Sequence, residues 1–256
     1  RAGKQEKMQA ILRQVKQKTS YQDEVSSTLA EISARQGDLD SALQEYADLA
    51  RQYRSKRQVE NALTVLKEMA QLAPQDPRAH AELADIYIVR GFLDEGMAEL
   101  RLLADIYLRN DRFEEAGEAL RRIGNIYAEM GNPEEAFINL RRAVELEPDD
   151  MGLLREVVGY ACQIGRSREA AEYQAIIARH YFETQQVKET VAALQQLIAL
   201  DRNNYDAYDM LGQTYQSVGE YEQASRVYKN LAKINPDNPV ARDRLASLQE
   251  LRARSV

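Results

Sequence analysis

The sequence contains few of the residues on which covalently linked or metal-based structures depend. Its 256 residues include one cysteine, Cys162, and two histidines, His80 and His180. A single cysteine excludes an internal disulfide, and two histidines far apart in the sequence do not form a cluster with metal-ligand spacing. We therefore expect no disulfide framework, no metal site and no cofactor.

Residues that interrupt helices are also rare. There are six prolines, twelve glycines and no tryptophan, whereas Ala, Leu, Glu, Gln and Arg are abundant, and these five favour helices. No apolar run approaches the roughly 18 residues that cross a bilayer, and the N-terminus lacks the apolar centre of a signal peptide. The sequence predicts an all-α protein without membrane insertion, which we expect to be cytoplasmic.

Positive charge is concentrated at the two ends of the chain. Residues 1–20 carry a net charge of +5 and residues 238–256 carry +2, so the residues between them carry −14 within a total of −7. Nucleic-acid binding requires a basic face that replaces counterions. The acidic middle therefore argues against a nucleic-acid partner. The basic N-terminal segment is expected to be a solvated amphipathic helix, and contact with an anionic surface is the alternative.

A five-residue sequence motif recurs along the chain. Copies that end in tyrosine are LARQY at 49–53, LADIY at 83–87 and 103–107, IGNIY at 123–127, IARHY at 177–181 and LGQTY at 211–215. Two further copies lack the tyrosine, and the offsets between successive copies are 20 or 34 residues. Several copies are followed by glycine four residues after the tyrosine, and some by a turn such as LAPQDP, LEPDD or INPDNP.

These features resemble the tetratricopeptide repeat, a helix–turn–helix unit with a period of about 34 residues. On this resemblance Ala84, Ala104 and Gly212 allow paired helices to approach, and Gly91 ends a first helix in a left-handed conformation. Lys, Asp or Gln replaces the turn glycine in other copies. The implied fold is a right-handed α-solenoid of about eight overlapping helix pairs, with about 14 helices.

The offset of 20 residues indicates that some helices serve two repeats. A helix of about 17 residues, which spans roughly 25 Å, can end one repeat and begin the next with a short turn. Such a helix contacts neighbours on two sides and needs apolar residues on both. We therefore expect Ala104 to be buried and Glu99, on the same helix, to be exposed.

The positions of the motif copies and of the turns between them predict one domain over residues 1–256. It consists of an N-terminal segment, 1–22, repeats over 23–237 and a capping helix within 238–256. The predicted helices are at about 5–18, 23–36, 39–54, 57–72, 77–90, 93–109, 112–130, 133–146, 151–164, 167–183, 187–200, 204–218, 221–234 and 238–253.

No residue set indicates catalysis. Pairs of carboxylates such as Glu134 and Glu135 stand at helix starts, where capping and the helix dipole favour acids. Cys162 has no convincing acid–base partners and is expected to be a small buried residue. We expect that the protein is not an enzyme.

The resemblance implies a binding function. In this family the first helices of successive repeats line a concave groove that receives a peptide or a partner helix, and some members grip a terminal carboxylate with Lys, Arg and Asn. The candidate peptide-binding residues are Arg121, Asn125, Arg155 and Arg179, which suit an acidic peptide. A solvated helix face is the alternative explanation for these four residues.

The function that follows is a non-catalytic scaffold for protein–protein interaction. Two alternatives stay open. Because the chain begins with Arg1 rather than Met, a regulatory or substrate-recruiting module of a larger enzyme is one of them. A structural subunit of a multiprotein assembly is the other. The partner and the oligomeric state are not specified by the sequence.

Overall fold

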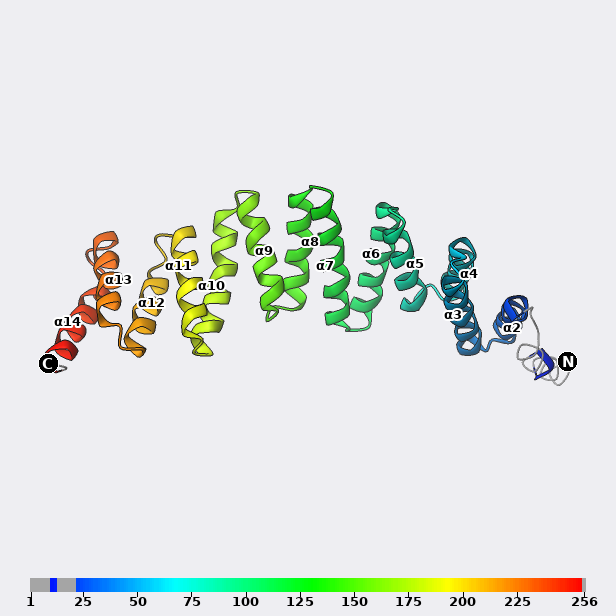
Figure 1. Cartoon of the computed structure of the whole chain (residues 1–256), viewed down its shortest axis with the longest axis horizontal. Helices are drawn as coiled ribbons and strands as arrows, with labels where there is room; N and C mark the ends of the chain where they lie inside the picture. The colour runs from blue at the N-terminus through cyan, green and yellow to red at the C-terminus, as the bar shows by residue number, and fades with distance from the viewer. Residues whose placement is uncertain (1–9, 13–21, 255–256) are drawn as a thin grey trace. The chain divides into compact units, whose positions relative to one another are not determined.

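The computed structural model describes residues 10–12 and 22–254, and these residues form helices and turns without any strand (Figure 1). Residues 10–12 are helical. The rest of the predicted helix at 5–18 lies outside the described residues.

Thirteen helices follow one another in the described part of the chain from residue 22 onward, and the predicted all-α repeat fold is confirmed. Each lies within two residues of its predicted bounds. They are α2 (Gln22–Gln36), α3 (Leu39–Ser55), α4 (Val59–Leu72), α5 (Pro77–Val89), α6 (Leu93–Arg109), α7 (Phe113–Glu129), α8 (Pro133–Leu146), α9 (Met151–Gln163), α10 (Ser167–Glu183), α11 (Val187–Leu200), α12 (Tyr205–Ser217), α13 (Tyr221–Ile234) and α14 (Pro239–Arg254).

Three-residue turns with a left-handed central residue join most of the helices. This residue has a φ angle of +76° to +80° at four glycines, and of +57° to +59° at Arg57, Asp111 and Gln185. A fifth left-handed glycine, Gly37, lies in the two-residue turn between α2 and α3. A β-carbon makes the left-handed conformation costly, which explains why glycine predominates. Asp and Gln replace glycine as expected, but the basic replacement is Arg57 rather than a lysine.

Four-residue turns follow α4, α8, α11 and α13. In each of them the last residue caps the next helix, because its side chain accepts a hydrogen bond from a backbone N–H of the first turn. These capping residues are Asp76, Asp150, Asn204 and Asn238.

The two kinds of turn account for the two sequence offsets. A helix of 17 residues with a three-residue turn makes the step of 20, and α3, α6, α7 and α10 have this length. Where a four-residue turn intervenes, the step covers a helix of 14 residues, such as α4, and one of 13, such as α5. These two helices and their turns restore the step of 34 residues.

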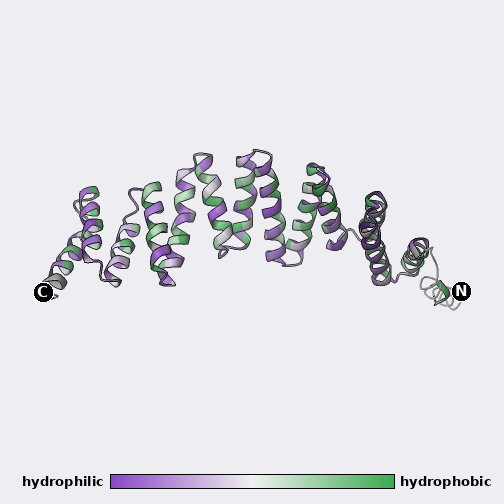
Figure 2. Ribbon diagram, viewed as in Figure 1, coloured by the Kyte–Doolittle hydropathy of each residue, from purple (hydrophilic) through white to green (hydrophobic). Residues whose placement is uncertain are grey.

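The chain divides into two compact units, Arg1–Ile126 and Tyr127–Val256, which we describe separately. In the first unit, Tyr46, Leu66 and Met69 are buried with Leu83 between α3, α4 and α5. In the second, a cluster around the fully buried Tyr228 joins α12, α13 and α14. The helices carry both hydrophobic and hydrophilic residues (Figure 2). The single domain over 1–256 remains a prediction.

Candidate functional site

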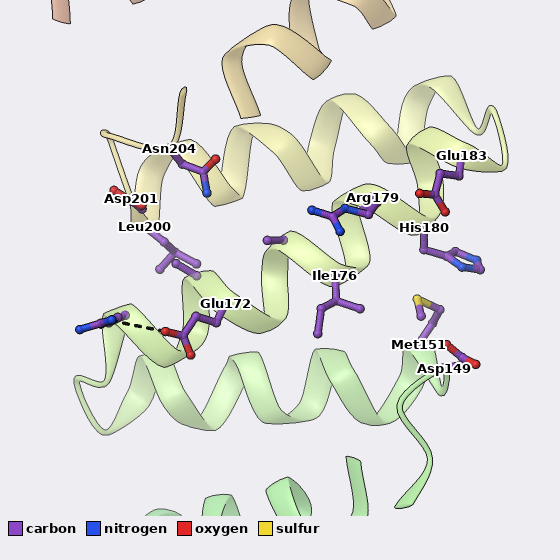
Figure 3. A pocket seen from close by; sticks show the side chains of 13 residues that line it. Asp149, Met151, Glu172, Ile176, Arg179, His180, Glu183, Leu200, Asp201 and Asn204 are labelled. Atoms are coloured by element: carbon purple, nitrogen blue, oxygen red, sulfur yellow. Dashed lines mark ion pairs between the residues drawn. The ribbon is translucent and has the colours of Figure 1, made fainter. Parts of the chain in front are cut away.

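The main candidate site is a groove along α10 in the second unit, which we call the α10 groove. It has a volume of about 810 Å³. One face of α10 forms its length, the start of α9 forms one end, and the turn between α11 and α12 forms the other (Figure 3). The lining residues are Asp149, Met151, Arg168, Ala171, Glu172, Ala175, Ile176, Arg179, His180, Glu183, Leu200, Asp201 and Asn204.

The spacing along α10 places these side chains on one face. Glu172, Ile176, Arg179 and Glu183 follow one another at intervals of four, three and four residues, which is the repeat of a single helix face. Ala171 and Ala175 lie on the same side, and their small side chains leave the space of the groove open. Ile176 is 43% exposed in the middle of this face, so the groove presents an apolar centre.

Hydrogen bonds fix both ends of the groove. Asp150, next to Asp149, caps α9 by accepting from the backbone N–H groups of Gly152 and Leu153 at 2.7 and 3.0 Å. At the other end, Asn204 caps α12, and the Asp201 carboxylate accepts from the backbone N–H of Asn203 at 2.9 Å. The ends are therefore held by the helix caps, whereas the α10 side chains between them point into open space.

The charges of the groove are mixed and mostly uncompensated. Arg168 and Glu172 form one exposed ion pair at 3.4 Å (Figure 3). Arg179, Asp149 and Glu183 are exposed, and within the described residues none of the three forms an ion pair. Charges of this kind remain available to a ligand.

A smaller groove occupies the corresponding place in the first unit, and we call it the α3 groove. Its volume is about 350 Å³, and Gln44, Ala47 and Arg51 of α3 line it with residues of α4 and α5. These three residues stand at the sixth, ninth and thirteenth positions of a 17-residue helix, as Glu172, Ala175 and Arg179 do in α10. The repeat has therefore produced two related grooves.

The charges of the α3 groove are paired within the chain. Arg51 pairs with Asp48, Arg78 pairs with Asp76 at 2.6 Å, and Glu82 pairs with Arg54. The hydrogen bond from Arg78 is the main reason why the pKa of Asp76 lies below its usual value. The α10 groove is the better candidate, because it is larger and has carboxylates without an ion pair among the described residues.

The four predicted residues are distributed over both units. Arg179 lines the α10 groove. Arg155 does not line it, and its guanidinium donates to the Tyr181 hydroxyl and lies 5.8 Å from the centre of that ring. Arg121, which is half-buried, and the exposed Asn125 lie one turn apart on α7 in the first unit. The set of four therefore remains a prediction.

Several lining residues were not predicted. Ile176 and Glu183 share the helix face of Arg179, and this spacing alone could have identified them. Met151, Leu200 and Asp201 come from other helices and turns, so their position depends on helix packing that the sequence pattern does not specify.

The expected burial of Cys162 is wrong, because this residue is exposed. Among the described residues there is no cluster of three or more His, Cys, Asp or Glu side chains suited to a metal ion. None of the described helices is both long and apolar enough to cross a membrane.

Comparison with known proteins identifies the repeat. Residues 117–150 and 181–249 each match a family model described as tetratricopeptide repeat. No curated protein matches the chain. The first matched segment corresponds to α7 and α8, and the second extends from the end of α10 into α14.

Solved structures with similar folds have low sequence identity. YrrB, described as a TPR protein with an unusual peptide-binding site, is 19% identical, with 83% of this chain and 91% of that chain covered and a TM-score of 0.40. MamA is 15% identical, with coverages of 75% and 90% and a TM-score of 0.40. The TPR2AB domain of yeast Sti1, solved with pHSP90, is 14% identical, with coverages of 83% and 84% and a TM-score of 0.40.

The two matched segments and the observed helix pairs with steps of 34 and 20 residues lead to one conclusion. This chain contains tetratricopeptide repeats, which the family models match at residues 117–150 and 181–249.

Proposed function

We propose that this protein is a non-catalytic interaction scaffold that binds a peptide or a partner helix in the α10 groove. Tetratricopeptide repeat proteins are generally interaction scaffolds without catalytic activity. The observation that carries the proposal is the groove of about 810 Å³ with the exposed Ile176 at its centre. A volume of this size suits the burial of ligand side chains.

Ile176 and Arg179 are the proposed central contacts. Ile176 offers apolar area that a ligand side chain would remove from water, and Arg179 on the next turn offers a guanidinium for a carbonyl or carboxylate of the ligand. Arg155 remains a further proposed contact in the second unit, whereas Arg121 and Asn125 remain proposed peptide contacts of the first unit alone. Arg155 would have to exchange its bond to Tyr181 for one to the ligand.

The test compares two isoleucines of similar exposure in the second unit. Ile176 is 43% exposed in the groove, whereas Ile138 on α8 is 40% exposed and does not line the groove. Partner proteins are captured with the wild-type chain and identified, and their direct binding is measured by calorimetry with Ile176→Glu and Ile138→Glu. Loss of an interface anchor costs about 2 kcal/mol or more, so we expect at least about tenfold weaker binding for Ile176→Glu.

The control should bind like the wild type. Equal affinities of both variants and the wild type would show that the partner binds elsewhere on the chain. Circular dichroism of each variant checks that the helices are intact.

A further inference from the structure

We propose that the α10 groove selects a partner segment with basic residues at both ends of a short apolar centre. This inference rests on the proposed function, because it specifies the ligand of the same groove. The features that support it are the charges at the two ends, the apolar middle and the contrast with the α3 groove.

Carboxylates lie at both ends of the groove. Asp149 and Glu183 are at the end formed by the start of α9, and Asp201 and Glu172 are at the end near the α11–α12 turn (Figure 3). These four carboxylates face only two guanidinium groups, those of Arg168 and Arg179. Both ends therefore favour cationic side chains of a ligand.

The ion pair that the groove already contains offsets little of this charge. Arg168 and Glu172 are 3.4 Å apart, and their side chains are 94% and 63% exposed. An exposed pair within one helix stabilises the protein only weakly, so Glu172 can exchange Arg168 for a ligand cation at little cost. Asp149 and Glu183 have no ion pair to exchange among the described residues.

The middle of the groove requires a different kind of contact. Ile176, Ala171 and Ala175 are apolar, and Arg179 is the arginine of α10 closest in sequence to Ile176 and Ala175. An apolar ligand side chain can cover Ile176, while Arg179 can donate to a backbone carbonyl of the ligand. A segment that is basic throughout would instead bring a cation against Arg179.

The distance between the acidic ends determines the length of the ligand. Glu172 and Glu183 are eleven residues apart on α10, which corresponds to roughly 16 Å along a helix. A ligand helix of about 12 residues covers the same distance. Its basic residues must therefore stand at its two ends.

The α3 groove shows that this charge pattern does not follow from the repeat itself. It has Gln44 where the α10 groove has Glu172, and its lining charges are paired within the chain. The helix geometry that α3 and α10 share provides a groove in both units, but of the two only the α10 groove combines it with uncompensated carboxylates.

The experiment uses two helical peptides of about 12 residues, with blocked ends and the same apolar Ala and Leu centre. One peptide has two lysines at each end, and the other has two glutamates at each end. Fluorescence anisotropy measures their binding to the whole chain. We expect the lysine peptide to bind about tenfold more tightly, with a preference that shrinks as salt rises.

Two charge-matched double variants assign this preference to the groove. Asp149→Lys with Glu183→Lys changes the groove, and Glu95→Lys with Glu118→Lys makes the same change in net charge at exposed positions outside it. The groove variant should lose or reverse the preference for the lysine peptide. The control variant should retain it.

Each other outcome overturns the inference. Equal binding of both peptides, or tighter binding of the glutamate peptide, would show a groove without this selectivity, while the proposed scaffold function would stand. A preference that the control variant also loses would come from the overall charge. If neither peptide binds, the inference fails, and the calorimetric comparison of Ile176→Glu with Ile138→Glu decides separately whether the groove binds a partner.

Discussion

At the scale of residues, His80 shows how one side chain can connect three segments. Its Nδ1 atom lies 2.6 Å from a carboxylate oxygen of Glu99 on α6, and its Nε2 atom lies 3.2 Å from the Pro74 carbonyl in the turn before α5. The His80 side chain is buried, with 8% of its surface exposed. A protonated imidazole can donate to both acceptors at once, whereas a neutral one can donate only once.

The environment of His80 predicts a pH-dependent stability. The hydrogen bond to Glu99 is the main reason why the pKa of His80 is raised above 6.5, and burial opposes it; the charge of Asp76 also raises it. Because the pKa is higher in the folded state, the stabilisation is fully present below about pH 6.5 and is lost as the pH rises through the raised pKa.

Urea unfolding at pH 6 and pH 9 measures this contribution. We expect His80→Gln and Glu99→Gln each to lower the free energy of unfolding at pH 6 by about 1 to 3 kcal/mol, the range for a hydrogen bond to a charged group. Both variants should lack the part of the pH dependence that belongs to His80. A variant that retains the full wild-type difference between the two pH values would contradict the role of this pair.

The His80–Glu99 contact also marks a limit of sequence reasoning. Glu99 was expected to be exposed, but its side chain is only 19% exposed because it packs against His80. The two residues are 19 positions apart on different helices. Helix periodicity predicts which face a residue occupies, but not which polar side chain of the neighbouring helix will meet it.

At the scale of elements, turn chemistry made the helix bounds predictable. Glycines at left-handed positions mark four of the three-residue turns and the two-residue turn between α2 and α3, and capping Asp or Asn residues mark the four-residue turns. Arg57, Asp111 and Gln185 adopt the left-handed conformation without glycine. At these three turns the helix end was predicted from the recurring tyrosine four residues earlier, and not from the turn residue itself.

Helix α6 offers a direct test of close helix packing. Ala104 is 1% exposed, so Ala104→Leu must force additional volume into a filled space. We expect it to lower the free energy of unfolding by roughly 1 to 3 kcal/mol, as measured by urea unfolding.

The same helix contains a matched control. Ala98 is exposed, and Ala98→Leu should change the free energy of unfolding by no more than about 0.5 kcal/mol. Similar small effects at both positions would mean that Ala104 does not set the approach of the helices.

At the scale of the whole molecule, the helices contact mainly their neighbours along the chain within each unit. The pairs α2–α3, α3–α4, α4–α5 and α5–α6 pack in the first unit, and successive pairs from α8–α9 to α13–α14 pack in the second. The stability of such repeat proteins is approximately a sum of local terms. Because of this regularity, the fold could be predicted from one recurring sequence motif. The α10 groove could not be predicted in this way, because its ends depend on residues that only helix packing brings together.

Gly212 provides a test of how far a local change spreads. A β-carbon at this position on α12 would overlap the ring of Tyr228 on α13. That ring cannot move aside easily, because Tyr228 is fully buried and its hydroxyl donates to the Asp209 carboxylate at 3.0 Å. Arg244 on α14 donates to the same carboxylate at 3.0 Å, so Gly212→Ala disturbs all three helices.

Hydrogen exchange measures the extent of this disturbance. We expect Gly212→Ala to cost roughly 1 to 3 kcal/mol and to speed amide exchange in α12, α13 and α14 by about tenfold or more, while exchange in α3, α4 and α5 stays as in the wild type. Gly159→Ala is the control, because a β-carbon there meets no atom within 4 Å and alanine favours the helix by about 0.5 to 1 kcal/mol. Faster exchange throughout the chain in Gly212→Ala would show that the protein unfolds as one cooperative block rather than by local steps.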